Sequence, residues 1–166
     1  MHASGYESLP ILEMMLGKII SRIRIVTFIY RGGFENDKGD LDLLCEDLSV
    51  FRFSSCDGGD LLTVSTEPWV DPYGNFLENK IPLDVSRYGR IGIIDVSENY
   101  PYSNLKGKEI VSVHPLISQF NLIAGCYLQL EVGVLCFMTQ ADEKFIYLED
   151  VNHNMNKLGF KFFNKT

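Results

Sequence analysis

The sequence predicts a mainly β protein (α+β if a short N-terminal helix is counted), built as an antiparallel β-sandwich or a partly closed barrel. Short apolar segments alternate with turn residues, and Asp57-Gly58-Gly59-Asp60 has the glycines that a tight hairpin needs. Residues 126–132 alternate apolar and polar side chains, the pattern of a strand with one buried face. The 166 residues and the 46% apolar content fit one folded domain, 1–166.

The N-terminal region predicts a helix followed by a long strand. Residues 9–16 are expected to be helical, with Ser8 as the N-cap and Gly17 just after the end. Residues 18–30 predict a strand, because β-branched residues dominate them. Alternation places one set of isoleucines on a single face: Ile19, Ile23, Ile25 and Ile29.

The remaining chain predicts a series of shorter strands. They are expected within 41–53, 61–66, 90–97, 108–117, 134–139, 144–148 and 158–163. Residues 140–143 form a turn between two of them. Residues 68–82 contain three prolines and Gly74, so we expect a loop there.

Two parts of the chain are alike. Gly17-Lys18-Ile19-Ile20 recurs as Gly107-Lys108-Glu109-Ile110, and each opens a predicted strand that an alternating hairpin follows. This predicts an internal duplication, with repeats at 16–66 and 106–150 that form two meanders packed together. Chance similarity is the alternative, because a Gly-Lys pair before an apolar strand is common.

The net charge of −7 is unevenly distributed. Between Glu35 and Glu78 there are eleven acidic residues and two basic ones, Lys38 and Arg52, so this acidic block carries −9. The rest of the chain carries +2. Such a field repels phosphate backbones and attracts basic partners, so no nucleic-acid partner is expected. The alternative is that the acidic loops only keep the protein in solution.

The sequence predicts a cytoplasmic protein without a membrane contact. Its first residues lack the basic segment of a signal peptide, and no apolar stretch has the ~20 residues that a membrane span requires. Four cysteines are too few for a disulfide framework, which indicates a reducing compartment: Cys45, Cys56, Cys126 and Cys136.

The usual signatures of metal and nucleophile chemistry are missing, so we expect no cofactor and no metal. The cysteines form no Cys-x-x-Cys pair, and the three histidines are dispersed. Cys126 and Cys136 are expected to be small core residues. Only His114 is central enough to act as a base, and a hydrogen-bonded structural imidazole is its alternative. Phosphate-binding glycine loops are absent from the sequence too.

Two alternatives to a protein-binding function stay open. A carboxylate-dependent hydrolase would need paired carboxyl groups, for which Asp84, Asp95 and Glu98 are the candidates. A structural or assembly module would instead use an apolar interface between copies. A single-stranded nucleic-acid site would depend on a few scattered arginines: Arg22, Arg24, Arg87 and Arg90.

The acidic block lies beside an aromatic loop, and together they predict a protein interface. Trp69 and Tyr73 would supply an apolar anchor within an acidic rim. The alternative for Trp69 is that it closes one end of the sandwich. The predicted partner-binding residues are Asp37, Asp40, Asp57, Asp60, Glu67, Trp69, Asp71 and Tyr73.

Three segments resemble a known class of bacterial proteins. They are Leu16-Gly17-Lys18-Ile19-Ile20, Gly89-Arg90-Ile91-Gly92-Ile93-Ile94-Asp95-Val96-Ser97 and Asp142-Glu143-Lys144-Phe145-Ile146. Over residues 16–150 the chain resembles the immunity proteins of contact-dependent inhibition and other polymorphic-toxin systems. The resemblance implies a cytoplasmic inhibitor, a monomer or weak homodimer, that binds a cognate toxin. A basic nuclease domain is the expected partner, and no functional residue is carried over by position.

Overall fold

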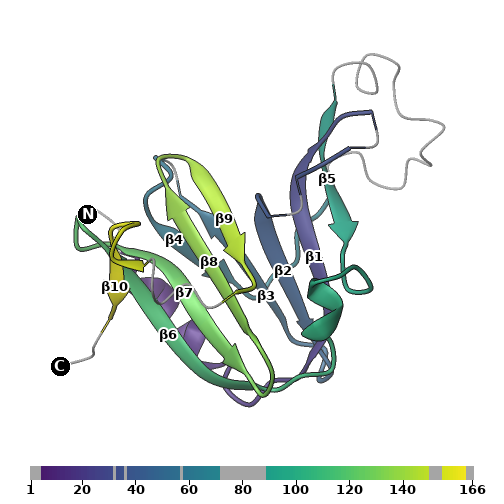
Figure 1. The fold of residues 1–166 in the computed structure, drawn as a ribbon, viewed down its shortest axis with the longest axis horizontal. Helices are drawn as coiled ribbons and strands as arrows, with labels where there is room; N and C mark the ends of the chain where they lie inside the picture. Colours follow the sequence, from purple (N-terminus) through teal and green to yellow (C-terminus); the bar gives the residue numbers. More distant parts are fainter. Residues whose placement is uncertain are drawn as a thin grey trace.

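The computed structural model describes residues 5–31, 33–35, 37–56, 58–71, 89–149 and 155–163. These residues form two antiparallel five-stranded sheets (Figure 1). The first contains, in spatial order, β4 (Leu62–Ser65), β3 (Val50–Ser55), β2 (Asp40–Cys45), β1 (Ile20–Ile29) and β5 (Arg90–Asp95). The second contains β10 (Phe160–Phe162), β6 (Ile110–Ser118), β7 (Ile123–Leu130), β8 (Val134–Gln140) and β9 (Glu143–Tyr147).

The predicted fold class is confirmed, and the structure distinguishes its two variants. The sheets pack as a sandwich and do not close into a barrel. The expected helix is present as α1 (Leu9–Glu13), preceded by the 3-10 turn η1 (Tyr6–Ser8). Figure 1 also shows that β1 and β5 extend together beyond the body of the sandwich as a two-stranded ribbon.

The helix begins differently from the prediction. Ser8 makes no capping bond. Its buried hydroxyl donates to the carbonyl of Leu62 at 3.1 Å and accepts the N–H of Val64 at 3.2 Å, so it fastens the start of α1 to β4. Gly17 has a φ of 79°, the left-handed conformation expected of a glycine after a helix.

A β-bulge in β1 changes which isoleucines face the core. The register with β2 shifts between Ile20 and Arg22, so Ile20 is fully buried together with Ile23 and Ile25. The prediction of Ile19 for this face was therefore wrong: Ile19 instead pairs with Glu109 across the gap between the sheets. An extra residue is invisible in a simple alternating pattern.

The two Gly-Lys segments contact each other directly. The N–H of Gly17 donates to the carbonyl of Ile110 at 2.9 Å, and the N–H of Gly107 donates to the carbonyl of Ile20 at 2.7 Å. The two isoleucine amides return bonds of 3.0 and 2.8 Å to the carbonyls of the lysines that follow the glycines. This reciprocal bridge joins the two sheets at the start of β1 and β6.

The two halves share their topology. Each sheet contains a four-strand meander, β1–β4 or β6–β9, and the fifth strand returns to pair with the first. The second half also has a bulge just after the bridge, between Ile110 and Ser112. The shared pattern extends past the predicted repeats 16–66 and 106–150 to include β5 and β10. Descent of both halves from one repeat stays a prediction.

The main core lies between the sheets. Phe53 on β3 meets Phe137 on β8 with ring centroids 5.6 Å apart, and both side chains are fully buried. Leu12 of α1 and the following Met15 extend this core. Complete burial of one such side chain stabilises the fold by about 1.5–3 kcal/mol.

The second sheet is also buried on its outer face, against our expectation for residues 126–132. The C-terminal segment places Met155 and Phe160 in a small apolar cluster on this face, where Tyr127 is only 6% exposed. Consequently β7 has two buried faces. Val132 was wrongly placed in the strand, since it lies in the turn before β8 and is 60% exposed.

The remaining local predictions are largely confirmed. The β3–β4 hairpin, the turn at 140–143, the β8–β9 pair and the last strand all form. Of the predicted loop 68–82, residues 72–82 lie outside the described residues, including Phe76.

We expect Gly17→Ala and Gly107→Ala each to lower the free energy of unfolding by about 1–2 kcal/mol, because an L-residue is strained in the left-handed region. Space is not limiting, since a Cβ at Gly107 would meet nothing within 4 Å. Asparagine tolerates this conformation better than alanine, so Gly107→Asn should lower the free energy of unfolding by less than Gly107→Ala does. Urea unfolding curves measure this, and an alanine variant as stable as the asparagine variant would contradict it.

Candidate partner-binding site

The predicted partner-binding residues fall into two separate places. Asp60 lies at the turn between β8 and β9, whereas Asp37 and Asp40 lie beside β9. Glu67, Trp69 and Asp71 lie on the segment that follows β4. Asp57 and Tyr73 lie outside the described residues.

The β8–β9 turn is tight and locked. Its two central residues, Ala141 and Asp142, have φ values of 51° and 65°, the left-handed conformation of a type I′ turn. The N–H of Ala141 donates to Oδ1 of Asp60 at 3.0 Å. Thr139 donates through Oγ1 to the carbonyl of Gly59 at 2.6 Å. The β3–β4 and β8–β9 turns therefore hold each other.

Gly59 lets the two turns approach this closely. A Cβ at this position would overlap the backbone N and Cα of Asp142, which cannot move aside as the end of a side chain can. The residue also has a φ of +70°, so both the close contact and the backbone conformation favour glycine here.

Carboxylates lie at this pair of turns and along the neighbouring edge of β9, a surface that we call the acidic end. Lys38 Nζ lies 3.6 Å from Glu35 and 4.0 Å from Glu143. The segment before β2 runs beside β9, because the carbonyl of Asp37 accepts the N–H of Ile146 at 2.8 Å. The acidic end thus combines the ammonium of Lys38 with the carboxylates of Glu35, Asp37, Asp60, Asp142 and Glu143.

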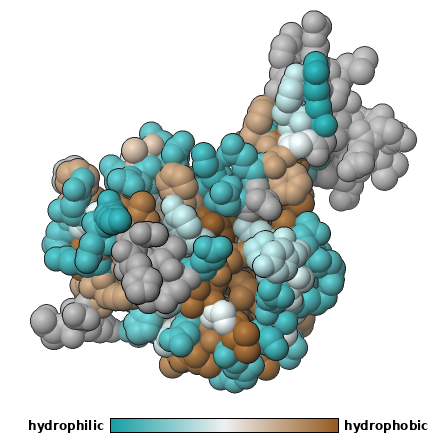
Figure 2. All heavy atoms as spheres, viewed as in Figure 1, coloured by the Kyte–Doolittle hydropathy of each residue, from teal (hydrophilic) through white to brown (hydrophobic). Residues whose placement is uncertain are grey.

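The acidic end is a hydrophilic part of the surface. In Figure 2 hydrophilic side chains line the upper rim of the body, where Figure 1 places the turn between β8 and β9. Hydrophobic side chains gather in the middle of this face and along its lower edge. Four of the five carboxylates are on exposed residues, and only Asp60 is half-buried.

Asp40 presents no free charge to a partner. It is only 6% exposed, and its carboxylate accepts bonds from Arg52 at 2.8 Å, Lys144 at 2.7 Å and Ser54 at 3.0 Å. The lysine comes from β9, so this ion pair joins the two sheets. Asp40 therefore stabilises the scaffold beside the acidic end.

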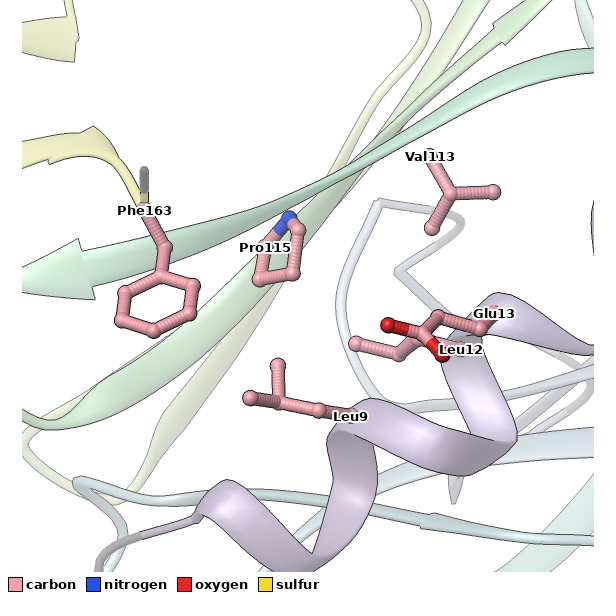
Figure 3. A pocket seen from close by; sticks show the side chains of 6 residues that line it. All are labelled: Leu9, Leu12, Glu13, Val113, Pro115 and Phe163. Carbon is pink, nitrogen blue, oxygen red and sulfur yellow. The ribbon is translucent and has the colours of Figure 1, made fainter. Parts of the chain in front are cut away.

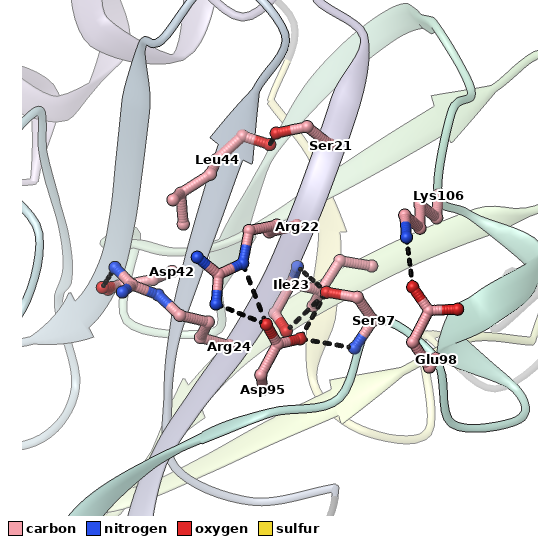
Figure 4. Close-up of polar contacts among 10 residues, drawn as sticks. All are labelled: Ser21, Arg22, Ile23, Arg24, Asp42, Leu44, Asp95, Ser97, Glu98 and Lys106. Atoms are coloured by element: carbon pink, nitrogen blue, oxygen red, sulfur yellow. Dashed lines mark hydrogen bonds and ion pairs between the residues drawn. The ribbon is translucent and has the colours of Figure 1, made fainter.

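The segment after β4 crosses the outer face of the first sheet. The backbone N–H of Trp69 donates to Oδ2 of Asp42 at 3.0 Å. Arg24 contacts the same oxygen at 3.0 Å, and the Asp42 side chain is completely buried (Figure 4). Asp71 pairs with Arg90 at 3.1 Å. The backbone of Trp69 is thus held over the outer face of the first sheet.

Asp95 fastens the end of β5 to β1 (Figure 4). Its carboxylate accepts bonds from Arg22 at 2.6 Å and from the Ser97 hydroxyl at 2.5 Å. That hydroxyl in turn bonds the backbone of Ile23. Partial burial opposes ionisation, but the hydrogen bonds from Ser97 and Arg22 outweigh it and lower the pKa of the Asp95 carboxyl.

Both of the proposed catalytic carboxylates that are described form ion pairs within the protein. Asp95 and Glu98 pair with Arg22 and Lys106, and Asp84 lies outside the described part of the chain. Of the arginines considered for nucleic-acid binding, the three that are described each pair with an aspartate. Arg87 lies outside this part.

The thiols and the metal-binding residue types form no reactive cluster in the described ranges. No group of three or more His, Cys, Asp or Glu side chains is placed there to hold a metal ion. The four cysteines form no disulfide, and only Cys56, just after β3, is partly exposed. Burial raises the pKa of Cys136 to about 12, which disfavours the thiolate that a nucleophile needs.

Comparisons with models of known protein families, with curated proteins and with solved structures found no match. Among the described residues, no helix has the length and apolar character needed to cross a membrane. Function is therefore inferred from the residues of this chain.

Sequence reasoning did not select Asp142, Glu143 and Glu35 for the acidic end. The first two were expected only as turn residues, because nothing local shows that they meet a turn 80 positions earlier. The predicted duplication contained a usable signal. If the two halves are superimposed by topology, the β3–β4 turn corresponds to the β8–β9 turn.

We expect Gly59→Ala to destabilise the protein by about 3 kcal/mol or more, because backbone overlap with Asp142 adds to the strain of a positive φ. Gly58→Ala is the matched control. Gly58 also has a positive φ, but a Cβ there would meet nothing within 4 Å, so it should lose only about 1–2 kcal/mol. Equal losses in chemical unfolding would show that the two turns are not in close contact.

We expect Asp95→Asn to lower stability at neutral pH by about 1 kcal/mol, because an amide NH2 group cannot accept the Arg22 bonds. The folded-state pKa of Asp95 is lowered, so its contribution is complete above the ordinary pKa of ~3.9 and is lost as the pH falls through the folded-state value. The difference between the two proteins should shrink at acidic pH. Unfolding curves at several pH values test this, and a constant difference would contradict it.

Proposed function

We propose that this protein is an immunity protein that binds a cognate bacterial toxin domain, a basic nuclease, and blocks its active site. The observation that carries the proposal is the acidic end, which holds five carboxylates, two of them, Glu35 and Glu143, paired with Lys38. A nuclease cleft is built to hold a polyanion. An acidic protein surface can occupy that cleft in place of the nucleic acid.

The rigidity of the acidic end supports this proposal. Asp60 accepts the backbone N–H of Ala141, and Gly59 lies directly against the β8–β9 turn. Carboxylates on locked turns lose little conformational freedom when a partner binds. The locked turns therefore reduce the entropic cost of binding a partner.

The distribution of ion pairs supports the same surface. Within the acidic block, Asp40, Asp42 and Asp71 are paired with arginine or lysine side chains. Their charges are largely balanced inside the protein. At the acidic end, Lys38 pairs with Glu35 and Glu143, so one ammonium offsets only part of the charge of five carboxylates, and the rest is available to a partner.

The direct test of this function is co-purification from the native host. The tagged protein should bring down one basic protein in a fixed ratio, and that protein should be toxic when it is expressed alone. Co-expression should abolish the toxicity. Recovery of the protein alone, or only with copies of itself, would contradict the proposal.

The role of the acidic end is tested by removing charge without changing side-chain shape. We expect the combined variant Glu35→Gln, Asp37→Asn, Asp142→Asn and Glu143→Gln to associate with the basic partner about tenfold more slowly at low ionic strength. Stopped-flow measurement gives the rate. Added salt should lower the association rate of the native protein more than that of the variant, because the native protein has the stronger electrostatic field.

A matched control removes the same number of charges elsewhere. Four exposed glutamates outside the acidic end serve for this variant: Glu7, Glu46, Glu131 and Glu149, each changed to glutamine. Its association rate should stay within about twofold of the native rate. If both combined variants slow association equally, net charge and not the acidic end governs binding.

A further inference from the structure

A pocket lies between α1 and β6, away from the acidic end. Figure 3 shows the side chains that line it: Leu9, Leu12, Glu13, Val113, Pro115 and Phe163. Its volume is about 190 Å³. Five of these six side chains are apolar, and the sixth carries a carboxylate.

The walls of the pocket are fixed by the fold. The N–H of Phe163 donates to the carbonyl of Pro115 at 2.9 Å, which continues the β10–β6 pairing to the pocket. The Phe163 ring also packs edge-on against Tyr6 of η1, with centroids 5.6 Å apart. On the opposite wall, Leu12 is anchored in the main core. The pocket is therefore a preformed space.

Its size and lining fit a small apolar group. An apolar cavity of about 150 Å³ accommodates benzene in another protein, so this pocket has room for a phenyl ring and a short alkyl chain. Apolar contacts would supply most of the binding free energy, as in most small-molecule sites.

Glu13 determines the polar end of such a ligand. In Figure 3 its carboxylate points from α1 toward the space that the apolar side chains line. An ammonium group would gain a charge-assisted hydrogen bond there, whereas a carboxylate would be repelled. Glu13 already takes part in another interaction of the chain. A carboxylate has about four acceptor positions, so it can accept an additional donor.

We propose that this pocket binds a small organic cation, an ammonium group attached to a phenyl or short alkyl body. The apolar part lies against Leu9, Val113 and Phe163, and the ammonium donates to Glu13. This site is separate from the acidic end and does not depend on the proposed function.

Three probes with one phenyl body and different head groups test the proposal. 2-Phenylethylammonium, 2-phenylethanol and 3-phenylpropionate are titrated into the ¹⁵N-labelled protein, and amide shifts are followed by NMR. We expect the ammonium to bind about tenfold more tightly than the alcohol, and the carboxylate to bind most weakly. Shift changes should be confined to residues around 9–13, 113–116 and 163.

Two charge-removing variants test the role of Glu13. Glu13→Gln should weaken binding of the ammonium about tenfold and leave binding of the alcohol unchanged. Glu7→Gln is the matched control, since Glu7 is exposed on η1 and does not line the pocket; it should have no effect. Equal binding of all three probes, or full ammonium binding by Glu13→Gln, would overturn the role of Glu13. Absence of local shifts at millimolar ammonium would overturn the site itself.

Discussion

The reciprocal backbone bridge between residues 17–20 and 107–110 is the contact on which the sandwich depends. The bridge holds the start of β1 against the start of β6, and in each of these strands a bulge follows the bridge. The bulge in β1 turns both Ile20 and Ile23 toward the core, although they are three residues apart. At the opposite end of the sandwich, the contact of Gly59 with Asp142 closes the second junction between the halves. The core is thus enclosed by backbone contacts at both ends, and these contacts require glycine because they need left-handed conformations and close approach.

The same topology leaves two sheets with very different outer faces. The first sheet carries cross-strand ion pairs, such as Arg24 with Asp42, and the second carries an apolar cluster that the C-terminal segment covers. Charge density along the sequence is therefore a poor guide to the surface field. Several acids of the block from 35 to 78 are balanced by cations brought from other strands. At the acidic end, by contrast, one lysine offsets only part of the charge of five carboxylates, which come from segments far apart in the sequence.

Much of the fold could be predicted because its signals are local. Alternating side chains marked most strands, and paired glycines marked the β3–β4 hairpin. The bulge at Ser21 was missed because an inserted residue leaves both flanking patterns intact. The candidate site was predicted only in part, for a physical reason: the burial of Asp40 depends on Lys144, which is 104 positions away, and no local pattern records such a partner. Asp37 and Asp60 were selected for their charge, and only long-range contacts show that the first lies beside β9 and the second at the β8–β9 turn.

The β3–β4 turn has a consequence for chemical labelling. The N–H of Gly59 donates to the carbonyl of Cys56, and the N–H of Cys56 donates to the carbonyl of Leu61. Cys56 therefore closes the turn that carries Asp60 of the acidic end. The other three cysteines are buried. A maleimide dye should accordingly attach at one natural position without any engineered thiol. Its emission would report the arrival of a binding partner from within a few residues of the surface where that partner is expected.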